Sequence, residues 1–211
     1  TAYEILDGDW SSDVCSSDWR SNFNQKNLPF IYAQLPNFME AKTQPAESNW
    51  AVFRAMQTKT LSVPKTAMTV NIDLGEWNDI HPMNKKDVAV RLALAAQKLA
   101  YNDRKAVFST PLYKSAKVKG NKVEISFSNI GSGLVSKDSK ELKHFAIAGS
   151  DKKFVWAKAE IKGNKVIVWS DRVAEPAAVR YAWADNPEGA NLFNKEGLPA
   201  SPFEAEIKSE K

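Results

Sequence analysis

The sequence is short of the residues that most often carry metal and redox chemistry. Among its 211 residues there is one cysteine, Cys15, and there are two histidines, His81 and His144. A lone cysteine forms no intramolecular disulfide and does not supply the paired ligands of a zinc site. Long apolar runs are also missing, since none reaches the roughly 18 residues that a membrane span requires. These absences exclude a disulfide framework and give no sign of a transmembrane helix.

An excess of charge of one sign is missing as well. The chain has 29 basic and 25 acidic residues, which gives a net charge of +4, and the two signs are interspersed. No basic run has aromatic residues threaded through it, so the sequence does not indicate a nucleic-acid partner. The 43% of hydrophobic residues is enough for an ordinary core. We therefore expect a globular protein with one large domain or two small ones.

The segment DWSSDVCSSD, residues 9–18, differs from the rest of the chain. It is polar and aperiodic, which predicts a loop. Its aspartates lack the alternate spacing and the glycine turn of a calcium loop. All ten residues resemble one reading frame of a common short-read sequencing adapter, GAC TGG AGT TCA GAC GTG TGC TCT TCC GAT. We therefore interpret residues 1–18 as a non-native or unassignable leader and assign no function to Cys15.

Residues 19–103 alternate between strand patterns and helix patterns. The apolar run Phe30–Leu35 predicts a buried strand, and segment 47–64 predicts a helix with polar residues near its start. Met68–Leu74 predicts a second strand, and the periodic segment after Asn84 predicts a second helix that this asparagine caps. This order of elements is typical of an α/β domain with a parallel sheet.

Residues 104–211 have a different character, with short alternating strands and no pattern that predicts a helix. The segments Ala116–Phe127 and Ala159–Ser170 both contain a Gly-Asn pair between alternating stretches, which predicts two hairpins. A third hairpin is expected to turn near Ser150–Lys152. We expect this half to form an all-β sandwich.

The segment DLGEWNDIHPMNKK places His81 after the second α/β strand and before a helix. Ligand and catalytic sites of open α/β sheets lie at this edge. Glu76 and Asp79 are close enough in sequence to orient the imidazole, although the spacing alone fits an ordinary loop histidine equally well. His144 opens a strand in the β half, and we interpret it as a surface or edge histidine.

Three blocks, LPFIYAQLPNF, WNDIHPMNKKDVAVRLAL and AVRYAWADNPEGANLFNKEGLPASPF, resemble the sialate O-acetylesterase family of SGNH-type carbohydrate esterases. The resemblance runs in order from about Trp19 to Phe203. It implies the C-terminal part of a flavodoxin-like, three-layer α/β domain in residues 19–103, followed by a β-sandwich domain in residues 104–211. It also implies hydrolysis of acetyl esters on sugars such as sialic acid, no metal or organic cofactor, and an extracytoplasmic (periplasmic or secreted) location.

The resemblance further implies the roles of individual residues. In this family a serine attacks the acetyl carbonyl while a histidine of the IHP block acts as general base, and this histidine matches His81. The family's aspartate, three residues before the histidine, is replaced by Asn78. We favour Asp79 as the orienting group over Glu76, Asn78 or a backbone carbonyl.

The serine block of the family and its oxyanion donors do not match any segment of this sequence; Ser21 lacks the preceding glycine. We therefore expect the chain to carry the base, to lack the nucleophile and to be inactive by itself. Its expected partners are an acetylated sugar and the missing N-terminal half of the same protein.

Three further positions match the family and are candidate substrate-binding residues: Gln34, Arg54 and Trp77. For each, a purely structural role is the alternative. Trp156, Trp169, Tyr181 and Trp183 in the β half are core residues or a sugar-stacking platform. Two other functions stay open, namely a non-catalytic carbohydrate-binding or interaction module and an SGNH esterase that acts on acetylated xylan.

Overall fold

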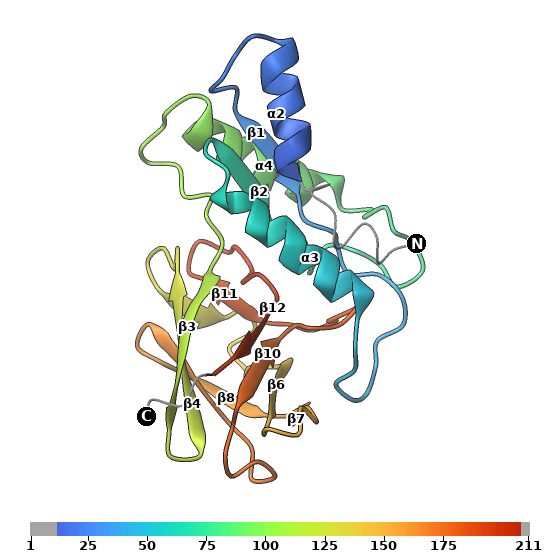
Figure 1. Cartoon of the computed structure of the whole chain (residues 1–211), viewed down its shortest axis with the longest axis vertical. Helices are drawn as coiled ribbons and strands as arrows, with labels where there is room; N and C mark the ends of the chain where they lie inside the picture. The colour runs from blue at the N-terminus through green and yellow to red at the C-terminus, as the bar shows by residue number, and fades with distance from the viewer. Residues whose placement is uncertain (1–11, 208–211) are drawn as a thin grey trace.

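The computed structural model describes residues 12–207 (Figure 1). Helices and a small parallel sheet form the part drawn at the top of Figure 1, and antiparallel strands form the part below it. The mixed α/β fold class expected from the sequence is confirmed. None of the described helices is long and apolar enough to cross a membrane.

The first described helix, α2 (Ser12–Asn22), contradicts the loop predicted for residues 9–18 over its described part. No proline or glycine interrupts this segment, and tertiary contacts at its end hold it against the sheet. The Arg20 guanidinium donates to the carbonyls of Leu28, Pro64 and Lys65. Local polarity therefore predicted the wrong structure because distant backbone groups stabilise the helix. Residues 9–11 lie outside the described residues.

Strands β1 (Phe30–Ala33) and β2 (Thr66–Thr69) pair in parallel, as predicted. The crossover between them contains α3 (Asn49–Lys59) and the short 3₁₀ helix η1 (Thr60–Ser62). Helix α4 (Lys85–Leu99) packs against both strands. Parallel strands need such a helical crossover because their ends lie at opposite edges of the sheet.

Both helix starts follow from their capping residues. The Ser48 hydroxyl accepts a hydrogen bond from the backbone N–H of Ala51, and the Asn84 amide oxygen accepts one from Asp87. The second strand was predicted too far along the chain, because pairing stops at Thr69. The next residues, 70–72, are buried without strand pairing, and the Asn71 amide there donates to backbone carbonyls of both strand ends.

The β part contains the three predicted hairpins and no helix among the described residues after position 104. Gly120 and Gly163 occupy the turns of two hairpins with φ of +63° and +60°, which glycine adopts without strain. Two four-stranded antiparallel sheets and one two-stranded sheet result. The strands of the first sheet are, in spatial order, β3 (Leu112–Lys119), β4 (Lys122–Ser128), β9 (Lys165–Trp169) and β8 (Lys158–Lys162). Those of the second are β12 (Phe203–Glu206), β10 (Ala178–Tyr181), β6 (Phe145–Ala148) and β7 (Val155–Trp156). The two-stranded sheet pairs β11 (Leu192–Asn194) with β5 (Leu134–Ser136).

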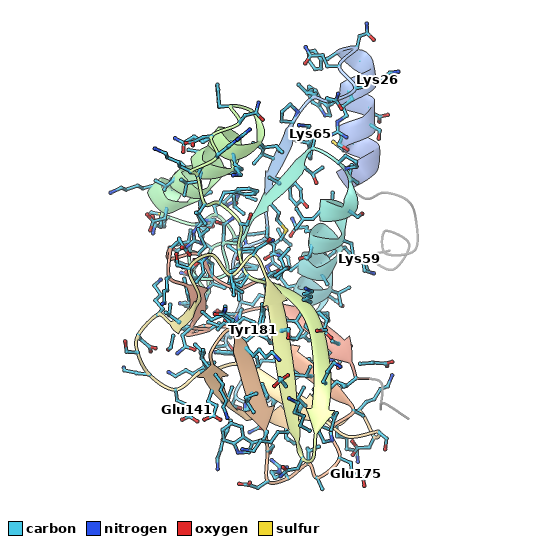
Figure 2. The ribbon with its side chains drawn as sticks, turned by 90° about the vertical axis from the view of Figure 1, so that its left-hand side faces the viewer. Lys26, Lys59, Lys65, Glu141, Glu175 and Tyr181 are labelled. Carbon is cyan, nitrogen blue, oxygen red and sulfur yellow. The ribbon has the colours of Figure 1, made fainter. Side chains whose placement is uncertain are left out.

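One hydrophobic cluster joins the β part to the end of β2. It includes Ile125 and Val168 from one four-stranded sheet, Tyr181 from the other, and Ile72 from the segment after β2. Figure 2 shows Tyr181 in the interior of the β part, where its hydroxyl accepts a hydrogen bond from the Leu192 backbone N–H. Apolar burial of this kind is the main favourable contribution to folding.

Arg54 makes the principal polar contact between the two parts of the chain. Its side chain is completely buried on α3, and its guanidinium donates to the carbonyls of Leu35, Pro36, Ala184 and Asp185 at 2.6–2.9 Å. Two of these carbonyls follow β1, and the other two follow β10. A single side chain therefore fixes the loop after β1 against the β part.

We expect Arg54→Lys to lower the free energy of unfolding by roughly 3 kcal/mol, because an ammonium cannot reach all four carbonyls and charged hydrogen bonds are individually strong. Chemical denaturation of the wild type and the variant measures the difference. The matched control Arg104→Lys, at an exposed position, should change stability by less than about 0.5 kcal/mol. Equal stability of both variants would contradict the role given to Arg54.

Candidate functional site

The carboxyl ends of β1 and β2 meet at one edge of the parallel sheet and face the β part. The chain that leaves β2 there runs through residues 70–84 before α4 begins. His81 lies in this connection, in the position where open α/β sheets carry their sites. The loop is largely exposed from Trp77 to His81.

Asp79 holds His81 by two hydrogen bonds. Its Oδ1 accepts from the His81 backbone N–H at 2.7 Å and lies 3.2 Å from the ring nitrogen Nδ1. The first of these bonds is the main reason why the pKa of Asp79 lies below its ordinary value, so this group is a carboxylate at neutral pH. A carboxylate only accepts hydrogen bonds, which places the proton on Nδ1 and leaves Nε2 as the basic nitrogen.

Glu76 closes the same loop from its other side. Its two carboxylate oxygens accept from the Met83 backbone N–H at 3.2 and 3.4 Å, and its backbone bridges to Asp79. The structure therefore brings Asp79, rather than Glu76, to the His81 ring. The two carboxylates therefore contact different groups: Asp79 contacts the imidazole and the backbone of His81, and Glu76 contacts the backbone of Met83.

The surface around His81 is apolar and open. The His81 side chain is 81% exposed, and the neighbouring Trp77, Ile80 and Met83 are exposed as well. Met39, from the loop after β1, donates its backbone N–H to the Trp77 carbonyl and adds another exposed apolar side chain. We call Met39, Trp77, Ile80 and Met83 the apolar rim. Large exposed apolar side chains in two adjoining loops are typical of a surface that another group covers.

Gln34 and Arg54, the other two candidate substrate-binding residues, lie in the interior. The Gln34 side chain is buried, and its amide nitrogen donates to the Arg54 carbonyl and to the hydroxyls of Thr58 and Ser201. The Arg54 guanidinium is occupied by the four carbonyls described above. Burial lowers its pKa, and the charge of Asp185 opposes this shift. These contacts favour a structural role, and substrate binding by Gln34 and Arg54 stays a prediction.

An ion pair fixes the segment between β2 and the His81 loop. Both oxygens of Asp73 accept from the Arg91 guanidinium of α4, at 2.7 and 2.9 Å, and Lys137 of the β part lies 3.3 Å away. Burial alone would raise the pKa of Asp73, but the hydrogen bonds and charges of Arg91 and Lys137 lower it below the ordinary value. Sequence reasoning missed this pair, whose partners lie 18 residues apart in different elements.

A second set of serine, histidine and aspartate residues lines one small enclosed cavity, but its hydrogen bonds are not those of a catalytic triad. The Ser48 hydroxyl donates to Asp185 at 2.6 Å and accepts from the Ala51 N–H. His144 Nε2 lies 2.6 Å from the Glu188 carbonyl. His144 precedes strand β6 as predicted, and it is half-buried.

Comparison with known proteins relates the chain to esterases that act on carbohydrates. No protein-family model matches it. It is 28% identical to the sialate O-acetylesterase of Mus musculus and 29% identical to that of Homo sapiens, over 90% of this chain but only 39% and 40% of those proteins. The chain thus spans about two fifths of the length of the curated relatives it matches.

A solved structure agrees with these relatives. The crystal structure of a carbohydrate acetylesterase from Xanthomonas citri superimposes with a TM-score of 0.84 and 45% sequence identity. The match covers 89% of this chain and 43% of that one. The fold described above therefore matches one part of that longer carbohydrate acetylesterase.

Asp73→Asn tests the ion pair that precedes the His81 loop. Because the pKa of Asp73 is lowered in the folded state, its contribution to stability is present above the unfolded-state pKa near 3.9 and is lost as pH falls through the folded pKa. We expect the variant to lose roughly 3 kcal/mol at pH 7, since the buried Arg91 loses its partner, and to lose less at pH 3.

Thermal unfolding between pH 3 and 7 measures this difference. The control Asp171→Asn removes a carboxylate from an exposed pair with Lys158 and should have little effect at any pH. A stability loss for Asp73→Asn that is as large at pH 3 as at pH 7 would contradict the linkage.

Proposed function

We propose that the chain is a member of the sialate O-acetylesterase family and carries the general base of a carbohydrate O-acetylesterase. The reaction is hydrolysis of acetyl esters on sugars, with O-acetylated sialic acid as the favoured substrate. The observation that supports the proposal is the His81–Asp79 pair at the carboxyl edge of the parallel sheet, in a chain similar to acetylesterases over 90% of its length.

His81 supplies the proton transfers of this reaction. Nε2 accepts the proton of a serine hydroxyl as the serine oxygen attacks the acetyl carbonyl. The imidazolium then protonates the departing sugar oxygen, which leaves as a hydroxyl. Water repeats the same sequence on the acetyl-enzyme and releases acetate. Asp79 accepts the Nδ1–H throughout, so it keeps the ring in one orientation and stabilises the imidazolium. Trp77 lies close enough in the loop to contact the sugar.

The nucleophile and the oxyanion donors come from a segment outside this chain. Three observations support this proposal. The apolar rim leaves His81 open to a partner. Strand β1 is only partly buried, whereas parallel strands are normally covered on both faces. The relatives are more than twice as long as the matched region.

On this basis, residues 19–103 are the C-terminal part of an SGNH α/β domain. Residues 104–211 are a β-sandwich domain in which the two four-stranded sheets contribute to one core. The extracytoplasmic location expected for the family is part of the same proposal.

A chimeric enzyme tests this function. Residues 19–211 are joined to the upstream region of the Xanthomonas citri carbohydrate acetylesterase, and hydrolysis of acetylated sialic acid and acetylated xylan is followed by release of acetate. We expect the chimera to be active and residues 19–211 alone to be inactive. His81→Ala should lower kcat/KM about a thousandfold, as loss of a general base does, whereas Val90→Ala on the exposed face of α4 should not.

An active His81→Ala chimera would refute the general-base assignment. Faster hydrolysis of acetylated xylan than of acetylated sialic acid would support the esterase function but assign acetylated xylan as its substrate.

The same chimera separates the roles of Asp79 and Glu76. Asp79→Asn should lower kcat about a hundredfold or more with little change in KM, because the amide no longer stabilises the imidazolium and can favour the wrong tautomer. Glu76→Gln should lower thermal stability more than kcat, because Glu76 holds the turn through Met83. The reverse pattern would assign the orienting role to Glu76.

A further inference from the structure

Trp156 is exposed and yet held in one orientation. It lies on β7 and is 36% exposed. Its indole N–H donates to the Thr43 carbonyl at 2.8 Å, and its ring meets the His144 ring edge to face, with centroids 5.7 Å apart at 84°. Figure 1 shows the loop between β1 and α3, which contains Thr43, descending beside β7. Two long-range contacts therefore fix an aromatic side chain whose surface stays partly open to solvent.

A hollow of about 340 Å³ opens beside this indole. Lys42 and Thr43 line it from the loop after β1, and Lys143 and His144 line it from the segment before β6. We call this hollow the indole pocket. Ligand sites commonly combine an aromatic surface with a few polar groups from different elements, and the indole pocket has this composition.

The charge of the indole pocket is positive. No acidic residue lines it, and neither Lys42 nor Lys143 forms an ion pair with any residue in the described part of the chain. Outside the lining, Glu47 pairs with Arg180, whereas the charge of Glu188 reaches His144. The two lysines are therefore the charged groups of the lining itself. Two ammonium groups beside an immobilised aromatic ring favour a ligand that has both an apolar face and a carboxylate.

His144 supports the pocket as an uncharged group. Because its Nε2 faces a carbonyl, which only accepts, the proton of the neutral ring resides on Nε2. Burial is the main reason why the pKa of His144 is lowered, and the charge of Lys143 lowers it further. The hydrogen bond to the Glu188 carbonyl and the charge of Glu188 raise the pKa, but they do not cancel the effect of burial. A neutral His144 adds no third cation, so the charge of the pocket comes from the two lysines.

The indole pocket is connected to the His81 loop. The segment that carries Lys42 and Thr43 begins next to Met39, whose backbone N–H donates to the Trp77 carbonyl. The Met39 carbonyl in turn accepts from Asn186, in the segment after β10. One loop therefore contributes both to the apolar rim and to the indole pocket, which suits two subsites of one extended ligand.

We propose that Trp156, Lys42 and Lys143 form a binding subsite for a carboxylate-bearing sugar. The indole stacks on the apolar face of the pyranose ring, and the ammonium groups bind the carboxylate. The choice of a sugar rests on the proposed function, whereas the preference for an anion follows from the pocket itself. The subsite lies in the chain described here, so binding to it does not require the nucleophile.

Binding is tested on the chain of residues 1–211 with N-acetylneuraminic acid and glucuronic acid as probes and their uncharged methyl esters as controls. Ligand-observed NMR and tryptophan fluorescence titrations give the dissociation constants. We expect at least one acid to bind roughly fivefold or more tightly than its ester at low salt, since each of the two exposed charge contacts strengthens binding modestly. This preference should decrease as ionic strength rises.

Matched variants separate the contributions. The double variant Lys42→Gln/Lys143→Gln should abolish the preference for the acid, whereas Lys26→Gln/Lys162→Gln, which removes two exposed charges elsewhere, should retain it. Trp156→Ala should weaken binding of acid and ester alike by about tenfold, and Trp156→Phe should weaken it less. Trp169→Ala, on β9, serves as the aromatic control. Circular dichroism verifies that each variant is folded.

Three outcomes would overturn the subsite: no binding of either acid, equal binding of acid and ester, or a preference that survives Lys42→Gln/Lys143→Gln. Each is independent of hydrolysis. An inactive chimera together with charge-selective binding would remove the proposed esterase function and leave the subsite. An active chimera without such binding would support the esterase function and overturn the subsite.

Discussion

The Arg54 guanidinium, buried among four carbonyl oxygens, is the interaction on which the arrangement of the two parts depends. A buried cation is costly unless every donor is satisfied, and here the acceptors come from the loop after β1 and from the segment after β10. Moving either segment would break two of the four hydrogen bonds and leave a buried cation only partly satisfied. The junction therefore tolerates little change in geometry.

Neighbouring contacts reinforce this junction. The Ser48 hydroxyl caps α3 and donates to the Asp185 carboxylate, so one residue both begins the helix and binds the segment after β10. Asn37 donates to Asn186 and accepts from the Gly75 backbone N–H. At Gly75 a Cβ atom would approach the Asn37 carbonyl to 2.1 Å, so only glycine fits there. The chain that leads to His81 thus starts from a fixed point.

The His81 loop itself depends on local bonds. Asp79 and Glu76 both lie within the loop and accept hydrogen bonds from its backbone N–H groups, and the Met39 backbone N–H connects the loop to the segment after β1. Under the proposed function, this local hydrogen bonding orients His81 while its ring stays exposed to a segment outside the chain. The Met39–Trp77 hydrogen bond joins this loop to the segment that lines the indole pocket.

Local signals predicted most of the fold and the place of His81 after the second parallel strand. Ser48 and Asn84 marked the helix starts, the Gly-Asn pairs marked hairpins, and the position of His81 after a strand indicated a site. The failures share one physical cause, since the deciding partners are distant in sequence. Helix α2 is held by carbonyls as far away as Pro64 and Lys65. No spacing rule could reveal that Arg54 is buried against carbonyls 130 residues further along the chain.

One long, uninterrupted read of the source DNA across the codons for Thr1 to Asn22 tests the central claim most directly. If this chain is the base-carrying part of a carbohydrate acetylesterase, the codons for residues 9–18 will be absent from the genome. An upstream reading frame with a Gly-x-Ser-Asn block will then continue into Trp19. If the codons for residues 9–18 are present and no such block precedes them, the chain has no serine nucleophile of its own. That result would contradict the proposed esterase function and favour a carbohydrate-binding protein instead.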